Sequence, residues 1–255
     1  MRLDLYLCKK GFYHSRTKAK QAIESGKVLL NKKVIKKPSY QIIENLLYDV
    51  SIDNKDDFVS LGGYKLKKTF EGFDFSPKNM VVADFGASTG GFTDCSVRYG
   101  AKRVYAIDLN DSLLDYSLKA NPVVKTIIKN VKEIKKKDFE EDIDLITADL
   151  SFISLTKIIP IMSDIIAENK YIIALIKPQF ELDKKMYFKN GIVRDFELHK
   201  DVCKKIYDKC IECHLMPLKI TTAPIYEDKN TEYLILLKKS FDMTNIIAFE
   251  ELFKF

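Results

Sequence analysis

The stretch Val81-Val-Ala-Asp-Phe-Gly-Ala-Ser-Thr-Gly-Gly-Phe92 decides the fold of this chain. It begins as a short apolar run of the kind that forms a buried strand, and it continues into a turn that contains Gly86, Gly90 and Gly91. Glycine lets the backbone N–H groups of such a turn approach a ligand that a side chain would keep away. A strand, a glycine-rich turn and a helix in this order are typical of a nucleotide-binding crevice. One loop of this kind is weak evidence by itself, so the rest of the chain has to support it.

Length and composition predict a soluble globular protein with one large α/β domain and an appendage, or with two modest domains. The 255 residues are 46% hydrophobic and 31% charged, which excludes disordered and collagen-like chains. No apolar run approaches the ~18 residues of a membrane helix, and the segment Met1-Arg-Leu-Asp-Leu-Tyr6 lacks the apolar centre of a signal peptide. We therefore expect a cytoplasmic protein without a membrane span, with its five cysteines reduced.

The cysteines do not predict a metal site. The pair Cys210-x-x-Cys213 has no second pair at the spacing of a zinc site and lies in a segment with helical character, so we expect no metal. The net charge of +6 permits binding to nucleic acid without proving it. The oligomeric state stays open between a monomer and a weak dimer.

The first 50 or so residues have the pattern of a separate, basic unit. Segment 15–26 begins with a serine suited to cap a helix and ends with a glycine, and segment 27–38 predicts two strands joined by a tight turn at Asn31-Lys32. Basic side chains lie on both elements and before them: Arg2, Arg16, Lys18, Lys20, Lys32 and Lys33. Such charges usually face solvent, but their clustering on a helix and a hairpin also suits a surface that binds phosphates.

From Val81 onward, strand patterns alternate with helix patterns, which predicts a mostly parallel sheet with helices on both faces. A helix that starts after the pair Gly62-Gly63 precedes this region. The last two strands follow one another without a helix, so they should form an antiparallel hairpin, the usual end of a class I methyltransferase sheet. The expected strands are 81–86, 103–108, 123–128, 144–149, 171–176, 218–222 and 232–237, and the expected helices are around 90–99, 111–119, 155–166 and 196–213.

An acidic residue lies where a nucleoside would need it. Asp108 ends the second strand, 22 residues after Gly86, and is placed to accept hydrogen bonds from ribose hydroxyls. This position does not distinguish NAD from S-adenosylmethionine. The loop lacks the strict G-x-G-x-x-G pattern of a pyrophosphate site, and a methyl donor carries no phosphate. A methyl-donor site is therefore favoured.

Four charged residues are predicted near the strand ends where open α/β sheets bind ligands: Lys65, Asp149, Lys177 and Glu232. Each alone could be a surface charge or a helix cap. Together they suit attack by a ribose 2′-hydroxyl, which is a poor nucleophile until its proton is removed. A lysine can accept a proton only when it is partly neutral, a state favoured by burial and by a second cation nearby. We expect Lys177 to be the base, Asp149 to be its partner, and Lys65 and Glu232 to position the reacting groups.

Two resemblances support this interpretation. The segment Arg2-Leu-Asp-Leu-Tyr-Leu7, followed by the spacing of residues 15–31, resembles the alpha-L RNA-binding motif of a small-subunit ribosomal protein and many pseudouridine synthases. The segments 84–95, 104–108, 149–155 and 176–181, together with Gly191-Ile-Val-Arg-Asp195, resemble the TlyA family. Its members are FtsJ-related ribosomal-RNA 2′-O-methyltransferases, and some were first described as hemolysins.

The resemblance implies a function, a fold and a set of site residues. It implies a class I methyltransferase sheet in residues 59–255 and an alpha-L RNA-binding domain with a linker in residues 1–58. The expected substrates are S-adenosylmethionine and cytidine in large-subunit ribosomal RNA, with small-subunit RNA as a second candidate, and the by-product is S-adenosylhomocysteine. The four charged residues would form the catalytic tetrad. The implied cofactor-binding residues are Asp84, Gly86, Ala87, Ser88, Thr89, Gly90, Gly91, Phe92, Asp108, Leu109, Asn130, Val131 and Asp149.

The sequence departs from the family pattern at three places. Leu61 and Lys132 stand where the family usually has arginine, and the lead-in to Glu232 is Tyr226-Glu-Asp-Lys-Asn230 instead of a glycine-rich segment. Two aromatic residues next to the expected tetrad, Phe152 and Phe180, could stack on a nucleotide base. The rival hypotheses are a membrane-active hemolysin and an RNA-binding factor whose methyltransferase fold is inactive.

Overall fold

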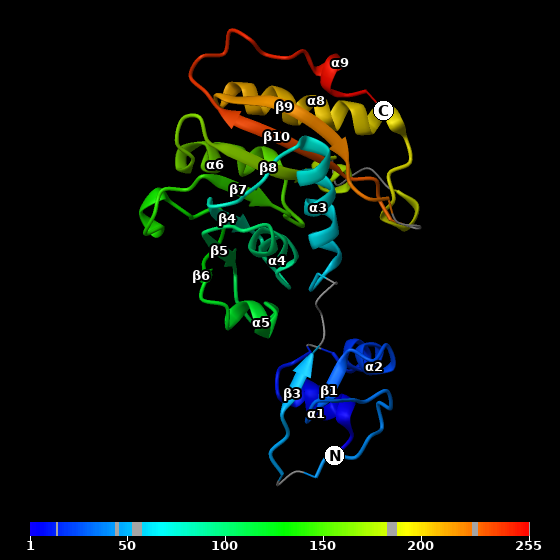
Figure 1. Ribbon diagram of the computed structural model, residues 1–255. Coiled ribbons are helices and arrows are strands. Elements are labelled where there is room, and N and C mark those ends of the chain that lie inside the picture. The colour runs from blue at the N-terminus through cyan, green and yellow to red at the C-terminus, as the bar shows by residue number, and fades with distance from the viewer. Residues whose placement is uncertain (14, 44–45, 53–57, 183–187, 226–228, 255) are drawn as a thin grey trace.

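The computed structural model describes all residues except 14, 44–45, 53–57, 183–187, 226–228 and 255. Most of the expected lead-in to Glu232 therefore lies outside the described residues. The chain forms a small N-terminal body and a larger α/β body, coloured blue and cyan to red in Figure 1.

The N-terminal body packs two helices against a three-stranded antiparallel sheet of order β2-β1-β3. Its elements are α1 (Leu3–Lys9), α2 (Arg16–Glu24), β1 (Val28–Leu30), β2 (Lys33–Val34) and β3 (Val50–Ile52). The serine expected as a cap does cap α2, because the hydroxyl of Ser15 accepts a hydrogen bond from the backbone N–H of Lys18. Asn31 and Lys32 both have positive φ, as a tight two-residue hairpin turn requires, so the predicted hairpin is confirmed.

The large body is built on a seven-stranded sheet of order β6-β5-β4-β7-β8-β10-β9. All neighbouring strands are parallel except β10, which is antiparallel to both β8 and β9. The predicted mostly parallel sheet with a final antiparallel hairpin is confirmed. The strands are β4 (Val81–Phe85), β5 (Arg103–Asp108), β6 (Val124–Ile128), β7 (Leu145–Ala148), β8 (Tyr171–Ile176), β9 (Leu215–Thr222) and β10 (Tyr233–Lys239).

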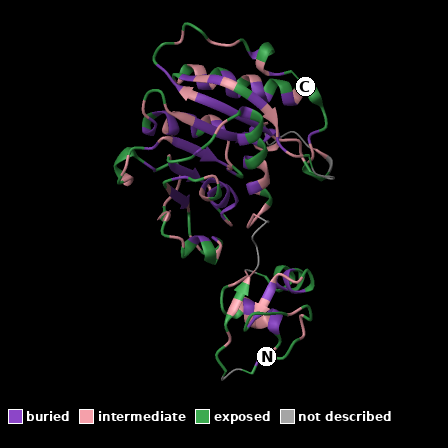
Figure 2. Cartoon of the chain, in the orientation of Figure 1, coloured by how far each residue is buried: buried purple, intermediate pink, exposed green. Residues whose placement is uncertain are grey.

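Helices cover both faces of this sheet (Figure 1). Successive strand residues point to opposite faces, so the central strands are buried on both sides and contribute to two separate cores. Figure 2 shows these strands mostly in the colour of buried residues. On one face, α3 (Leu61–Phe73) and α4 (Gly91–Arg98) pack over residues such as Val82. On the other face, α6 (Ile159–Ile165) and α8 (Phe196–Glu212) pack over residues such as Ala83.

The remaining described elements are short. They are α5 (Tyr116–Lys119), α7 (Pro178–Glu181) and α9 (Phe249–Leu252), and the 3-10 turns η1 (Lys136–Asp138), η2 (Leu155–Lys157) and η3 (Lys189–Gly191). Three expected helices are therefore wrong in extent. The first includes the Gly62-Gly63 pair instead of following it, the helix expected over 111–119 is reduced to α5, and the helix expected over 155–166 is divided into η2 and α6.

Candidate active site

The glycine-rich turn connects the end of β4 to the start of α4, at the edge where the parallel strands end. Gly86 and Gly90 have φ of 82° and 93°, which L side chains rarely adopt. A Cβ at Gly86 would lie 3.1 Å from the carbonyl oxygen of Asp149 and 2.8 Å from the side chain of Leu150. The turn thus comes into close contact with the segment that follows β7, which only glycine permits.

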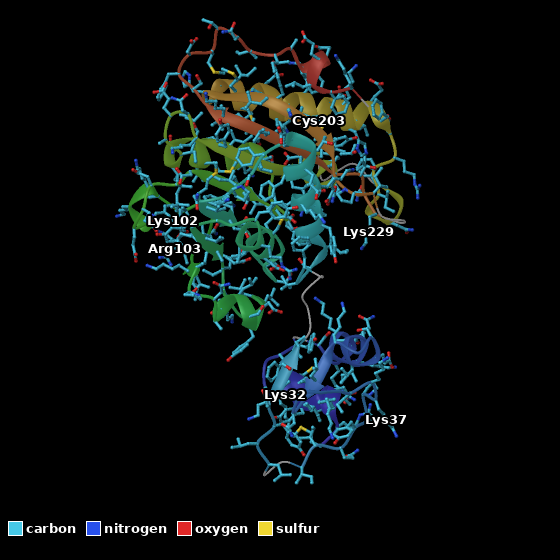
Figure 3. All side chains as sticks on the ribbon, in the orientation of Figure 1. Lys32, Lys37, Lys102, Arg103, Cys203 and Lys229 are labelled. Carbon is cyan, nitrogen blue, oxygen red and sulfur yellow. The ribbon has the colours of Figure 1, made fainter. Side chains whose placement is uncertain are left out.

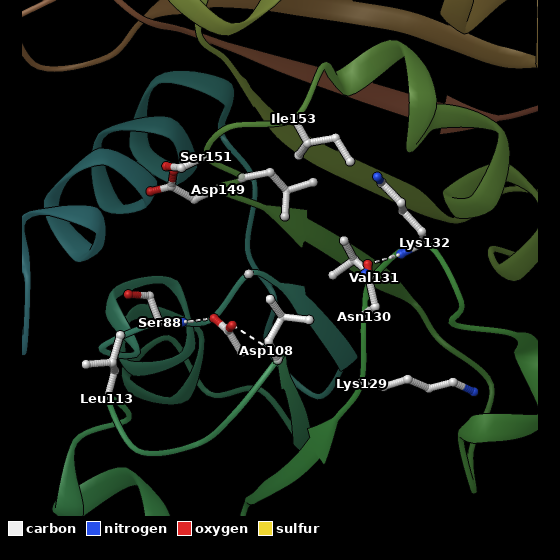
Figure 4. A pocket seen from close by; sticks show the side chains of 13 residues that line it. Ser88, Asp108, Leu113, Lys129, Asn130, Val131, Lys132, Asp149, Ser151 and Ile153 are labelled. Carbon is white, nitrogen blue, oxygen red and sulfur yellow. Dashed lines mark hydrogen bonds between the residues drawn. The ribbon is translucent and has the colours of Figure 1, made fainter.

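A cavity of about 370 Å³ opens beside this turn (Figure 4). Apolar side chains of Leu113, Val131 and Ile153 share its wall with polar groups from the ends of β4, β5 and β7. Seven of the residues expected to bind the cofactor line this cavity: Gly86, Ser88, Asp108, Leu109, Asn130, Val131 and Asp149. A second cavity of about 160 Å³ is lined by four more of them: Ala87, Thr89, Gly91 and Phe92.

Backbone N–H groups of the glycine-rich turn and of the next residue hold the Asp108 side chain in place. Its Oδ2 accepts a hydrogen bond from the backbone N–H of Ser88 at 2.8 Å, and its Oδ1 accepts one from Leu109 at 2.7 Å (Figure 4). Each carboxylate oxygen keeps a lone pair that can accept from a hydroxyl. An acceptor at one end of a partly apolar cavity fits the ribose and the ring of an adenine nucleoside. The cavity and its carboxylate acceptor therefore fit S-adenosylmethionine, the methyl donor that the sequence predicts.

Two of the expected cofactor residues line neither cavity. Gly90 packs under Leu114 and Leu118, so that an added Cβ would lie 2.3 Å from Leu118 Cδ1. Asp84 is fully buried and accepts hydrogen bonds from the hydroxyls of Thr93 at 2.6 Å and Thr147 at 3.0 Å. Burial raises the pKa of the Asp84 carboxyl to about 7. Its hydrogen bonds join β4 to α4 and β7, and so they fix the two ends of the glycine-rich turn to the sheet.

Lys177 lies at the end of β8 and is 8% exposed. Its Nζ is 2.5 Å from Asp149 Oδ1 and donates a hydrogen bond to Ser151 Oγ at 3.0 Å. The second cavity is lined by all three of these residues. Because Asp149 and Ser151 also line the larger cavity, the Lys177–Asp149 ion pair lies at the boundary between the two cavities. The sequence interpretation missed Ser151, although it lies within the quoted segment 149–155.

A second ion pair forms at the same sheet edge. Lys65 Nζ on α3 lies 2.6 Å from Glu232 Oε2, and both side chains are 15% exposed. The antiparallel register pairs Tyr233 with Ile176, so Glu232 lies beside Lys177 in the neighbouring strand. The structure thus brings Glu232 to this edge despite the altered segment that precedes it, and the four expected residues form two ion pairs there.

Two aromatic rings lie near Lys177. Phe152 is 89% exposed and has a φ of 64°, and its ring lies 5.0 Å from that of Phe180. The Phe180 ring is in turn 5.8 Å from Lys177 Nζ. An exposed phenylalanine in an unfavourable backbone conformation is unusual, since neither burial nor local geometry accounts for it.

Glu181 is a supporting residue that the sequence interpretation quoted without a role. Its carboxylate accepts hydrogen bonds from Ser154 Oγ at 2.5 Å and from the backbone N–H of Leu155 at 2.6 Å. Burial raises its pKa. These bonds fix α7, which follows Lys177, to the segment that follows Asp149.

His199 is also buried. Its Nε2 donates a hydrogen bond to the carbonyl of Val193 at 3.0 Å, and its Nδ1 accepts one from the Tyr233 hydroxyl at 3.1 Å, so its role is structural.

The residues expected to bind RNA all lie in the N-terminal body and are exposed: Arg2, Arg16, Lys18, Lys20, Lys32 and Lys33. Lys32 stands at the hairpin turn (Figure 3). The two departures from arginine, Leu61 and Lys132, are exposed as well, and Lys132 lines the larger cavity.

Among the described residues, no helix is long and apolar enough to cross a membrane, and no three histidine, cysteine or acidic side chains are grouped to hold a metal ion.

Comparisons with known proteins agree with this geometry. Residues 58–240 match the FtsJ-like methyltransferase family, and residues 1–45 match the S4 domain. Hemolysin A of Brachyspira hyodysenteriae is 38% identical over 92% of this chain and 98% of its own length. The protein named 16S/23S rRNA (cytidine-2′-O)-methyltransferase TlyA in Mycobacterium tuberculosis is 30% identical over 94% of this chain and 91% of its own.

A solved structure shows the same arrangement. A hemolysin from Streptococcus thermophilus superposes with a TM-score of 0.71 at 30% identity, over 99% of this chain and 94% of that one. Family match, relatives and sheet order lead to one assignment: the chain is an enzyme of the FtsJ-like methyltransferase family, of the TlyA type that also carries an S4 domain.

Proposed function

We propose that this enzyme transfers a methyl group from S-adenosylmethionine to the 2′-hydroxyl of cytidine in ribosomal RNA. The observation that carries the proposal is the position of the Lys177–Asp149 pair, which borders a nucleoside-sized cavity and lies beside a second lysine–carboxylate pair. The choice of cytidine rests on the names of relatives, which act on 16S/23S or on 23S rRNA. Large-subunit RNA is the first candidate and small-subunit RNA the second.

In this proposal, the larger cavity holds the adenosyl group. Asp108 would accept hydrogen bonds from the ribose hydroxyls, and Asn130 and Val131 would contact the adenine. S-adenosylmethionine supplies an electrophilic methyl group on sulfur and leaves as S-adenosylhomocysteine. The remaining residues of the turn, Gly86 to Phe92, would shape the cavity, whereas Asp84 would act from beneath them.

The two ion pairs would prepare the nucleophile. As the 2′-oxygen bonds to the methyl carbon, its proton has to leave, and neutral Lys177 Nζ is the group we assign to receive it. Nζ has a lone pair for that proton when Asp149, whose Oδ1 lies 2.5 Å away, holds the proton that the pair shares. Asp149 and Ser151 hold that nitrogen in place through contacts of 2.5 and 3.0 Å. Lys65 on α3 and Glu232, which directly precedes β10, would position the ribose. Orientation of this kind lowers the barrier without any new chemistry.

Phe152 and Phe180 would bind the target base. Sequence-specific binding to RNA commonly stacks an unpaired base on an aromatic ring. Phe152 offers an exposed ring beside Phe180, whose own ring lies 5.8 Å from Lys177 Nζ. We assign the ring pair to this role.

We further propose that residues 1–58 form an RNA-binding domain with a linker and that residues 59–255 form the catalytic domain. The hydrophobic core of the N-terminal body draws on residues up to Ile52. The cores of the large body include Phe58, the last residue of the linker, and the residues after it. The S4 domain would bring ribosomal RNA to the site, which implies that the enzyme works in the cytoplasm, where ribosomes assemble.

The test is to incubate the purified protein with unmodified ribosomal subunits and labelled S-adenosylmethionine, and to map the methylated nucleotides. We expect the label on the 2′-oxygen of one or a few cytidines. Label on a base atom, or none above that of the Lys177→Ala variant, would contradict the proposal.

A further inference from the structure

Asp4, in the first turn of α1, is a buried carboxylate in a body whose other described charged residues are all at least partly exposed. Its side chain is 4% exposed. Oδ1 accepts hydrogen bonds from Arg2 Nε at 3.0 Å and from the backbone N–H of Leu5 at 2.9 Å. Oδ2 accepts from Arg2 Nη2 at 3.0 Å and from Arg16 Nη2 at 3.2 Å. The hydrogen bonds from Arg2 are the main cause that lowers the Asp4 pKa to about 2, so the carboxylate is charged at neutral pH.

The two arginines are held by this carboxylate and are still open to solvent. Arg2 directly precedes α1 and Arg16 is the first residue of α2, and their side chains are 45% and 58% exposed. Within the described part of the chain, Nη1 of both arginines and Nε of Arg16 have no hydrogen-bond partner. Each guanidinium therefore keeps donors that can reach a phosphate oxygen.

One carboxylate thus sets the spacing and direction of two cations from different helices. A free arginine loses rotamer freedom when it binds a phosphate, whereas an arginine that is already fixed loses less. We propose that Asp4 is a positioning residue for RNA: it holds Arg2 and Arg16 as a preformed pair that binds neighbouring phosphates of the RNA backbone. The inference rests on the proposed function, because it takes ribosomal RNA as the substrate.

A simple charge argument predicts the opposite effect of Asp4. An acidic residue beside two arginines reduces the local positive potential, so its removal should strengthen RNA binding. If Asp4 acts by positioning, its removal should weaken binding although the net charge rises. The sign of the change separates the two interpretations.

The experiment measures affinity of the full-length protein for purified 16S and 23S rRNA over a range of salt concentrations. The matched control is Glu24→Gln, which also removes one negative charge but breaks only the exposed pair with Lys20 on α2. We expect Asp4→Asn to bind about tenfold more weakly than wild type. The slope of log K against log salt should fall by about one to two phosphate contacts. Glu24→Gln should bind at least as well as wild type. Equal or tighter binding by Asp4→Asn would overturn the inference.

A second set of variants separates positioning from loss of the fold. The double variant Arg2→Gln, Arg16→Gln should weaken binding as much as Asp4→Asn does. Adding Asp4→Asn to that double variant should cause no further loss, because the residues through which Asp4 acts are already gone. A further loss would mean that Asp4 serves only the fold, and would overturn the inference. Wild-type protein that neither binds nor methylates rRNA would instead overturn the proposed function.

Discussion

Lys177 and Lys170 make a natural comparison, since they lie just beyond opposite ends of the same strand, β8. Each pairs with an aspartate at 2.5 Å, Lys177 with Asp149 and Lys170 with Asp144. Only the first pair borders the cavities, and the side chain of its lysine is 9% exposed whereas that of Lys170 is 41% exposed. The chemistry that we assign to Lys177 thus depends on its place at the carboxyl edge of the sheet and not on the pair itself.

Lys177→Ala should reduce methyl transfer by a factor of at least about 100, the usual contribution of a general base. Binding of S-adenosylmethionine should change little, because Lys177 does not line the larger cavity. Methylation assays and calorimetry measure the two effects. Lys170→Ala is the control and should retain activity. If Lys177→Ala keeps near-wild-type turnover, the base assignment is wrong.

Phe152→Ala should weaken use of the RNA and leave the methyl donor unaffected. Loss of one stacked base costs about 1–3 kcal/mol, which corresponds to a fall in kcat/KM for RNA of roughly five- to 150-fold. Phe241 is a matched control, because it is also an exposed phenylalanine (63%) and it lies beside Lys239, away from both cavities. Similar losses for Phe152→Ala and Phe241→Ala would refute the stacking role.

At the scale of elements, alternation of apolar strands and helices was enough to predict the sheet. Local chemistry explains where helix predictions were wrong. The side chain of Phe58 packs against the backbone of α3 at Gly63, where an added Cβ would lie 2.3 Å from it. This close packing outweighs the poor helix propensity of glycine. In the region expected to be helical from 111, Asn110 and Asp115 accept hydrogen bonds from Ser112 and Ser117, which favours turns.

Sequence alone also could not place the ion pairs. It suggested that four charged residues lie at one edge, but the pairing of Lys65 with Glu232 depends on the α3 position and on the β10 register. The burial of Asp84 was missed for a similar reason. An acid at the end of a strand can face the ligand or the core, and only the hydroxyls of Thr93 and Thr147 decide for the core.

Asp84 gives a pH-dependent prediction for β4 and its neighbours. Its folded pKa of about 7 lies above the ordinary value of 3.8. Below the ordinary value, the proton is bound in both states. As the pH rises, the unfolded state ionises first, so stability falls until about pH 7 and then levels off. The Asp84 contribution to the free energy of unfolding should therefore decrease between about pH 4 and pH 7.

The Asp84→Asn variant should lose this decrease. Urea unfolding at about pH 5 and about pH 8 should show wild type losing more stability than the variant over that interval. The control is Asp115→Asn at the half-buried N-cap of α5, and it should follow the pH dependence of wild type. An identical pH dependence in wild type and Asp84→Asn would show that Asp84 is ionised in the folded state.

At the scale of the whole molecule, the two bodies have separate cores. The N-terminal core includes Leu3, Leu7 and Ile23, and its described members all precede Phe58. A contact joins the bodies where the rings of Phe12 and Tyr116 lie 6.0 Å apart. A body of about 50 residues with so small a core has little stability to spare. We therefore expect it to unfold separately from the catalytic body.

Leu7→Ala should test this separation. Leu7 is fully buried, and truncation of such a leucine costs about 2–5 kcal/mol, enough to unfold a body of this size. Binding of S-adenosylmethionine should stay intact, because the cavity residues all lie in the large body, whereas RNA affinity should fall sharply. Leu234→Ala, at a fully buried position in β10, should have the opposite effect on thermal unfolding. It should lower the transition temperature of the large body and leave that of the N-terminal body unchanged. A single transition that moves as one in both variants would mean that the bodies unfold together, and the RNA-binding body could not then be altered without disturbing the catalytic one.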